Sequence, residues 1–188
     1  MDNIINILGF AGSLRQGSYN RALLRTAQDL VPEGAKLEIF YLDGIPVYNQ
    51  DLEPDRPQKV VEFKTKIRAA DALLIVTPEY NYSIPGVLKN AIDWASRPPA
   101  DNVFQGKPVA IMSASTGMLG GARSQYHLRQ ILVFLDMYPI NKPEVFVTFA
   151  DKKFDASGKC TDEKGLEVVS ALLKALMAWT RKLQGQSS

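Results

Sequence analysis

Short apolar runs alternate along the chain with longer segments in which apolar residues recur at helical spacing. The runs with strand character cover residues 4–10, 37–42, 72–77, 109–113 and 144–149. The segments with helical periodicity cover residues 22–31, 58–70, 85–95, 122–135 and 164–183. The run at 72–77 is apolar at nearly every position, which is typical of a strand buried on both faces of a parallel sheet.

Five strands alternating with five helices predict an α/β three-layer sandwich with a parallel sheet. We expect a single domain over residues 1–184, because no linker or internal repeat interrupts the alternation. Residues 185–188 are predicted to form a disordered tail. The polar, proline-rich stretch at 49–57 is interpreted as a loop rather than a domain boundary.

Composition narrows the available chemistry. The 188 residues include 22 Lys and Arg against 20 Asp and Glu, a net charge of +2, which gives no reason to expect a nucleic-acid partner. The chain has one cysteine, Cys160, and one histidine, His127, so it has no internal disulfide and no Cys-rich or His-rich metal site. We expect Cys160 to be exposed after its Gly-Lys turn, and His127 to have a surface or interface role.

The beginning of the chain lacks the basic and apolar regions of a signal peptide. Its longest apolar runs, such as 131–135, are far too short to span a bilayer. The sequence therefore predicts a cytoplasmic protein with no membrane partner.

Ligands of open parallel sheets bind beyond the carboxyl ends of the strands, so the loops after the first, third and fourth strands form the candidate site. The first loop, residues 9–20, leads into a helix whose N–H groups can hold an anion. Ser13, Ser18 and Asn20 add short polar side chains, and Arg15 adds a charge suited to phosphate. The loop is neither a Walker A motif, because Ser18 stands where the lysine would be, nor a G-x-G-x-x-G fingerprint. The alternative is a polar helix-capping loop with turn glycines.

The second loop, residues 77–86, is stiffened by prolines and has Tyr80, Asn81 and Tyr82 at its tip. Aromatic and amide groups on a rigid loop can flank a flat heteroaromatic ring and bond to its edge; the alternative is a proline-stiffened surface loop.

The third loop, residues 113–123, contains three glycines that permit close approach of backbone N–H groups to a ligand. Taken alone, the third loop could equally be a flexible connector.

In this order and spacing, the three loops resemble the signatures of the NAD(P)H-dependent FMN reductase family. The matching residues are Gly12-Ser13-Leu14-Arg15 with Ser18 and Asn20, then Pro78-Glu79-Tyr80-Asn81 through Trp94, and finally Gly117, Gly120-Gly121 and Arg123. The resemblance covers nearly the whole domain, and within the family it is strongest to the bacterial chromate and quinone reductases.

The resemblance implies a flavodoxin-like fold with sheet order 2-1-3-4-5, helices on both faces and non-covalently bound FMN, with NADPH or NADH as electron donor. It further implies a set of FMN-binding residues. These are Ser13, Arg15, Ser18 and Asn20 at the phosphate, Pro78, Glu79, Tyr80 and Asn81 at the ring, Ser115, Thr116 and Gly117 in the third loop, and Tyr19 and Tyr82 as further cofactor-binding residues.

A bound flavin would carry the redox chemistry itself, which suits a chain with few catalytic side chains. We therefore expect no catalytic side chain, and a ping-pong oxidoreductase that passes electrons from NAD(P)H to quinones, free flavin, azo compounds or chromate. The alternatives are a flavodoxin-type electron carrier and a flavin-free interaction module. A carrier is disfavoured because flavodoxins are usually strongly acidic, whereas this chain has a net charge of +2. The choice between NADPH and NADH stays open, with Arg97 and Arg123 as candidates for the 2′-phosphate.

The segment 122–135 is apolar nearly all round, since Val133 and Phe134 flank its inner stripe, and this predicts burial on more than one side. We therefore expect a homodimer or homotetramer, as the resemblance also implies. Trp94 and Met137 are expected to add apolar bulk nearby. The candidate polar interface residues are Arg123, Tyr126 and Glu144. The alternative is a helix packed wholly within one chain.

Overall fold

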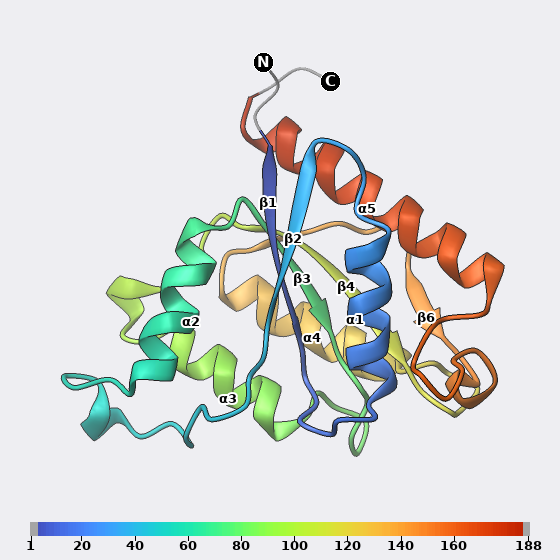
Figure 1. The fold of residues 1–188 in the computed structure, drawn as a ribbon. Coiled ribbons are helices and arrows are strands. Elements are labelled where there is room, and N and C mark those ends of the chain that lie inside the picture. Colours follow the sequence, from blue (N-terminus) through green and yellow to red (C-terminus); the bar gives the residue numbers. More distant parts are fainter. Residues whose placement is uncertain (1–3, 186–188) are drawn as a thin grey trace.

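The computed structural model describes residues 4–185, in which a six-stranded sheet lies between two layers of helices (Figure 1). The strands are β1 (Ile5–Ala11), β2 (Ala35–Phe40), β3 (Ala72–Val76), β4 (Pro108–Ala114), β5 (Tyr138–Pro139) and β6 (Val145–Val147). The helices are α1 (Tyr19–Asp29), α2 (Gln58–Ala69), α3 (Gly86–Ala95), α4 (Ala122–Phe134) and α5 (Glu163–Leu183). No helix of this described range is long and apolar enough to cross a membrane.

The sheet has the order β2-β1-β3-β4-β5, and all its pairs are parallel, which confirms the predicted flavodoxin-like topology. The fifth position differs from the prediction because two short strands share it. β5 pairs with the beginning of β4 and β6 with its end. Pro139 and Pro143 lack the N–H groups that one continuous ladder would need, so the strand is interrupted between them.

The core consists of two apolar clusters, one on each face of the sheet. α1 and α5 cover one face, while α2, α3 and α4 cover the other (Figure 1). Every residue of β3 is buried, as its unbroken apolar run predicts, and every residue of β4 is buried as well.

α1 begins three residues before the predicted position and ends two residues earlier. Ser18 is its N-cap, with an extended backbone and a side chain that accepts from the N–H groups of the first turn. The helix ends at Asp29 because Val31 precedes Pro32, and the residue before a proline disfavours the helical conformation.

The expectation of an exposed Cys160 is wrong: its side chain is only 6% exposed and belongs to the cluster beneath α1 and α5. The Gly-Lys turn does occur, with Gly158 at a φ of +83°. Immediately after it, however, an antiparallel bridge between Phe154 and Cys160 turns both side chains into the core. Of the predicted tail, residues 186–188 lie outside the described range.

A buried lysine ties α2 to the segment that follows α3. Lys64 donates to the carbonyl oxygens of Arg97 at 2.6 Å and Asp101 at 3.0 Å, and pairs with the Asp101 carboxylate. Burial lowers the pKa of Lys64. Burial alone would raise the pKa of Asp101, but hydrogen bonds from Lys64 and Arg68 outweigh it and lower that pKa.

The outer face of α4 leaves two large apolar side chains in solvent: Val133 is 77% exposed and Phe134 81%. Trp94 and Met137, in contrast, are buried within this chain and add nothing to the exposed surface, which corrects the expectation for them. Trp94 is fixed in the core by a hydrogen bond from its indole nitrogen to the Pro46 carbonyl.

Candidate functional site

The loops after β1, β3 and β4 meet at the carboxyl edge of the sheet, in the lower part of Figure 1. Direct contacts join them. The Gly12 N–H donates to the Val76 carbonyl at 2.8 Å, which fixes the first loop against the end of β3. The predicted phosphate, ring and third-loop residues therefore occupy one edge.

The first loop presents a row of free backbone donors at the positive end of α1. Ser18 Oγ accepts from the N–H groups of Asn20 and Arg21. Among residues 4–185, the N–H groups of residues 14–17 and of Tyr19 donate to no protein acceptor. Arg15 is exposed, and its guanidinium carbon lies 5.8 Å from the Tyr19 ring centroid. N–H groups without a partner in the described range, beside an exposed guanidinium, fit a phosphate group.

The Asn20 side chain faces β4 instead of the open loop. It is 3% exposed, its Nδ2 donates to the Ala114 carbonyl, and the Ala114 N–H donates to its Oδ1, both at 2.9 Å. β3 ends at Val76 opposite Met112, two residues short of Ala114, so the amide supplies a partner that β3 no longer offers. Asn20 therefore positions the loop, and its contact with a phosphate stays a prediction.

Arg21 is a structural residue of this site that sequence reasoning missed. It is 5% exposed, its Nε donates to the Ser13 carbonyl at 2.8 Å, and its guanidinium pairs with Asp43. The hydrogen bond to Ser13 thereby fixes the backbone of the first loop. A signal was present in the sequence, because a basic residue in the first turn of a helix opposes the helix dipole and needs a specific partner.

The second loop ends in a tight hairpin. Tyr80 and Ser83 exchange two backbone hydrogen bonds, of 2.9 and 3.0 Å. Asn81 and Tyr82 between them have φ angles of 51° and 65°, both left-handed, which is the signature of a type I′ turn. Tyr80 and Tyr82 are 53% and 68% exposed, so both residues are available to a ligand. Pro78, two residues before the hairpin, is buried.

Arg123, at the start of α4, joins the second loop to the third. Its Nη1 lies 3.0 Å from Glu79 Oε1, and its backbone N–H donates to Glu79 Oε2 at 3.1 Å. Its guanidinium carbon also lies 4.0 Å from the Tyr82 ring centroid, a cation–π contact. Arg123 thus has partners within its own chain. The other two candidate interface residues also pair within the chain, since Tyr126 Oη donates to Glu144 Oε1 at 3.2 Å.

The third loop is exposed at Thr116 and Gly117, and Ser115 Oγ accepts from the Gly117 N–H at 3.1 Å. The last residue of this loop before α4, Gly121, must be a glycine. Gly121 has a φ of +85°, and a Cβ there would lie 2.8 Å from the Ser113 Cβ. The close approach allows α4 to begin directly against β4 and so to reach the hairpin.

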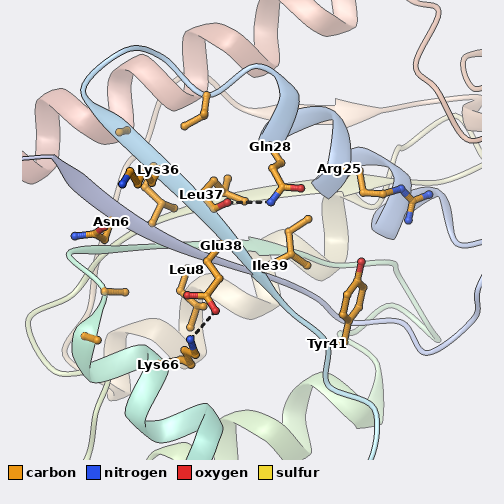
Figure 2. Close-up of a pocket in the computed structure, with 15 residues that line it drawn as sticks. Asn6, Leu8, Arg25, Gln28, Lys36, Leu37, Glu38, Ile39, Tyr41 and Lys66 are labelled. Carbon is orange, nitrogen blue, oxygen red and sulfur yellow. Dashed lines mark hydrogen bonds and ion pairs between the residues drawn. The ribbon is translucent and has the colours of Figure 1, made fainter.

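A separate hollow of about 980 Å³ runs along β2 between α1 and α2 (Figure 2). Gln28 donates to the Leu37 carbonyl at 3.0 Å, and Lys66 pairs with Glu38 at 2.7 Å. These contacts cover the free edge of the sheet, as exposed edge strands require. The hollow has no glycine loop and is not the candidate site.

The order of the sheet, the donor row at α1 and the aromatic hairpin together define the flavodoxin-like class of FMN-binding proteins. Comparison with known proteins specifies the class further: residues 5–152 match the model of the NADPH-dependent FMN reductase family. The chain belongs to this family, and is accordingly an NAD(P)H-dependent oxidoreductase that uses FMN.

Individual relatives agree with this assignment. An NAD(P)H-dependent FMN reductase of Pseudomonas aeruginosa is 55% identical over 186 residues, which cover 98% of this chain and all of the relative. An NAD(P)H:quinone oxidoreductase of Solanum tuberosum is 48% identical, over 97% of this chain and 96% of its own. The solved structure of FerB, a flavoenzyme NAD(P)H:(acceptor) oxidoreductase from Paracoccus denitrificans, superimposes with a TM-score of 0.88 at 35% identity, covering 95% of this chain and 98% of that one.

Proposed function

We propose that this enzyme transfers electrons from NADPH or NADH to quinones by a ping-pong mechanism, with free flavin, azo compounds and chromate as further acceptors. The observation that carries the proposal is the exposed aromatic hairpin beside the free donor row, at one edge of the sheet. FMN, when bound, accepts the reducing equivalents and passes them to the acceptor. Relatives named as quinone oxidoreductases support quinones as the principal class.

Within this proposal, the first loop holds the phosphate. The N–H groups of residues 14–17 and of Tyr19 donate to its oxygens, together with the hydroxyls of Ser13 and Ser18. Ser18 can do this while it caps α1, because its oxygen accepts from the helix and its proton stays free to donate. Arg15 supplies the compensating charge.

The second and third loops hold the ring. Tyr80 and Tyr82 provide apolar surface, Asn81 provides an amide for the ring edge, and Ser115, Thr116 and Gly117 close the site from the opposite loop. Pro78 and Glu79 support the ring-binding hairpin at its entry, since Pro78 is buried and Glu79 pairs with Arg123. The chain thus binds and orients the cofactor, and no side chain needs to act as an acid or base.

Nicotinamide and acceptor would approach the same exposed hairpin, so the oxidised nicotinamide must leave before the acceptor binds. Initial rates measured at several fixed quinone concentrations should therefore give parallel double-reciprocal lines. Intersecting lines would contradict the ping-pong order. A survey of both nicotinamides against a benzoquinone, free FMN, an azo dye and chromate tests the acceptor class, and no turnover with the benzoquinone would refute it.

We also propose that the outer face of α4 packs against a second copy, in a homodimer or homotetramer. Val133 and Phe134 would lose their exposure there, and a groove of about 310 Å³ between α3 and α4 adjoins Phe134. Light scattering that gives a monomer of 20.8 kDa would contradict this. One domain over residues 1–184 and a cytoplasmic location remain part of the proposal on the sequence arguments alone.

A further inference from the structure

α4 holds the hairpin with two side chains that are one helical turn apart. Arg123 contacts Glu79 and Tyr82, at the entry and the tip of the hairpin. His127, four residues later, places its Nδ1 2.7 Å from Ser83 Oγ, at the exit. Residues spaced by four lie on the same helix face, so this face of α4 contacts the hairpin at both ends.

The hairpin needs such external support because its turn is strained. Asn tolerates the left-handed conformation comparatively well, but Tyr82 is a bulky residue that rarely adopts it. Strained backbone of this kind persists only where the surrounding structure fixes it. Arg123 supplies one such constraint through the Tyr82 ring.

Ser83 is the point through which His127 acts. The backbone N–H and carbonyl of Ser83 both bond to Tyr80 and close the hairpin. Within the described part of the chain, its hydroxyl bonds only to His127. The contact exists in either arrangement, with Ser83 donating to a bare Nδ1 or accepting from a protonated one. His127 is exposed, and within residues 4–185 its side chain makes no hydrogen bond with the residues assigned to the cofactor.

We propose that His127 is a positioning residue for the flavin ring: its hydrogen bond to Ser83 holds the Asn81–Tyr82 turn in the shape that receives FMN. The inference rests on the proposed function and deepens it. It assigns a role to the single histidine, which the redox chemistry itself does not use.

The geometry allows a matched pair of variants. An asparagine side chain places a hydrogen-bonding atom near the position of imidazole Nδ1, whereas glutamine reaches toward the position of Nε2. His127→Asn should therefore keep the contact with Ser83, and His127→Gln should lose it. Ser83→Ala removes the same bond from the other side, and Gln130→Ala, at an exposed site further along α4, is the neutral control.

The experiment titrates each deflavinated protein with FMN by fluorescence quenching and records the circular dichroism of the bound flavin. His127→Gln and Ser83→Ala should each weaken FMN binding by about three- to tenfold, the effect of one neutral hydrogen bond. Both should also change the flavin dichroism. His127→Asn and Gln130→Ala should bind FMN like the wild type. Combining His127→Gln with Ser83→Ala should cause no further loss, because both remove one interaction.

Three results would overturn the role of His127: wild-type affinity in His127→Gln, equal losses in the Asn and Gln variants, or additive losses in the double variant. A wild-type chain that takes up no FMN would instead contradict the proposed function. Thermal unfolding of the apo proteins separates a folding defect from a positioning effect. All variants should unfold close to the wild-type midpoint, since the contact lies at an exposed site.

Discussion

Replacing Asn20 by alanine should destabilise the protein even without FMN, because the amide satisfies buried backbone groups of β4. The substitution removes the hydrogen bonds to the Ala114 carbonyl and N–H, both 2.9 Å long. Each buried group left without a partner costs about 1–3 kcal/mol, so the two together cost about 2–6 kcal/mol. Domains are typically stable by only about 5–15 kcal/mol, which makes this a large loss.

Urea unfolding of the deflavinated proteins, followed by far-ultraviolet circular dichroism, measures the effect directly. Arg15→Ala is the control, since Arg15 is exposed and should affect FMN binding without affecting apo stability. Asn20→Asp should destabilise the protein at least as much as alanine near pH 7, because its buried carboxylate keeps an acceptor for the Ala114 N–H but places a second, charged oxygen against the Ala114 carbonyl. An unfolding free energy for Asn20→Ala equal to that of the wild type would refute the positioning role. It would return Asn20 to the purely cofactor-binding role expected from the sequence.

Three further predictions test other parts of the structure. Ser13→Ala combined with Arg15→Ala should weaken FMN binding by about ten- to a hundredfold, because both would contact an anionic phosphate; an unchanged dissociation constant would contradict the assigned loop. Asp101→Asn should destabilise the protein near pH 7 and have less effect in acid. The lowered folded-state pKa of Asp101 stabilises the fold above the unfolded value of about 3.9, and this contribution disappears as the pH falls through the folded value, so unfolding measured at pH 7 and pH 3 should show a shrinking difference. Phe134→Asp should raise the dissociation constant of the proposed dimer by at least about a hundredfold in sedimentation analysis, because the proposed interface would cover the exposed Phe134 ring of each copy; an unchanged constant would place the interface elsewhere.

The sheet and its helices could be predicted from local patterns because each element contains its own signal. The apolar run of β3 and the helical stripes require no knowledge of distant residues. The division of the fifth sheet position into β5 and β6 was missed, since prolines indicate an interruption but do not say whether pairing resumes beyond it.

The location of the candidate site was predictable for a topological reason, because the ends of parallel strands share one edge. The contacts that shape the site were not. Glu79 and Arg123 are 44 residues apart, as are Ser83 and His127, and no local pattern indicates that either pair would meet. The prediction for Cys160 was wrong for a similar reason. The turn before it indicates where the chain reverses, but the direction of the thiol depends on the bridge to Phe154.

The central claim is that this chain oxidises a reduced nicotinamide through its own bound FMN and delivers the electrons to a quinone. Anaerobic mixing of the FMN-loaded protein with NADPH or NADH, followed by addition of a benzoquinone, tests it most directly. We expect the visible absorbance of the flavin to be lost with at least one nicotinamide and to return when the quinone is added. Flavin absorbance that neither nicotinamide diminishes would contradict the account and indicate an electron carrier of the flavodoxin type instead.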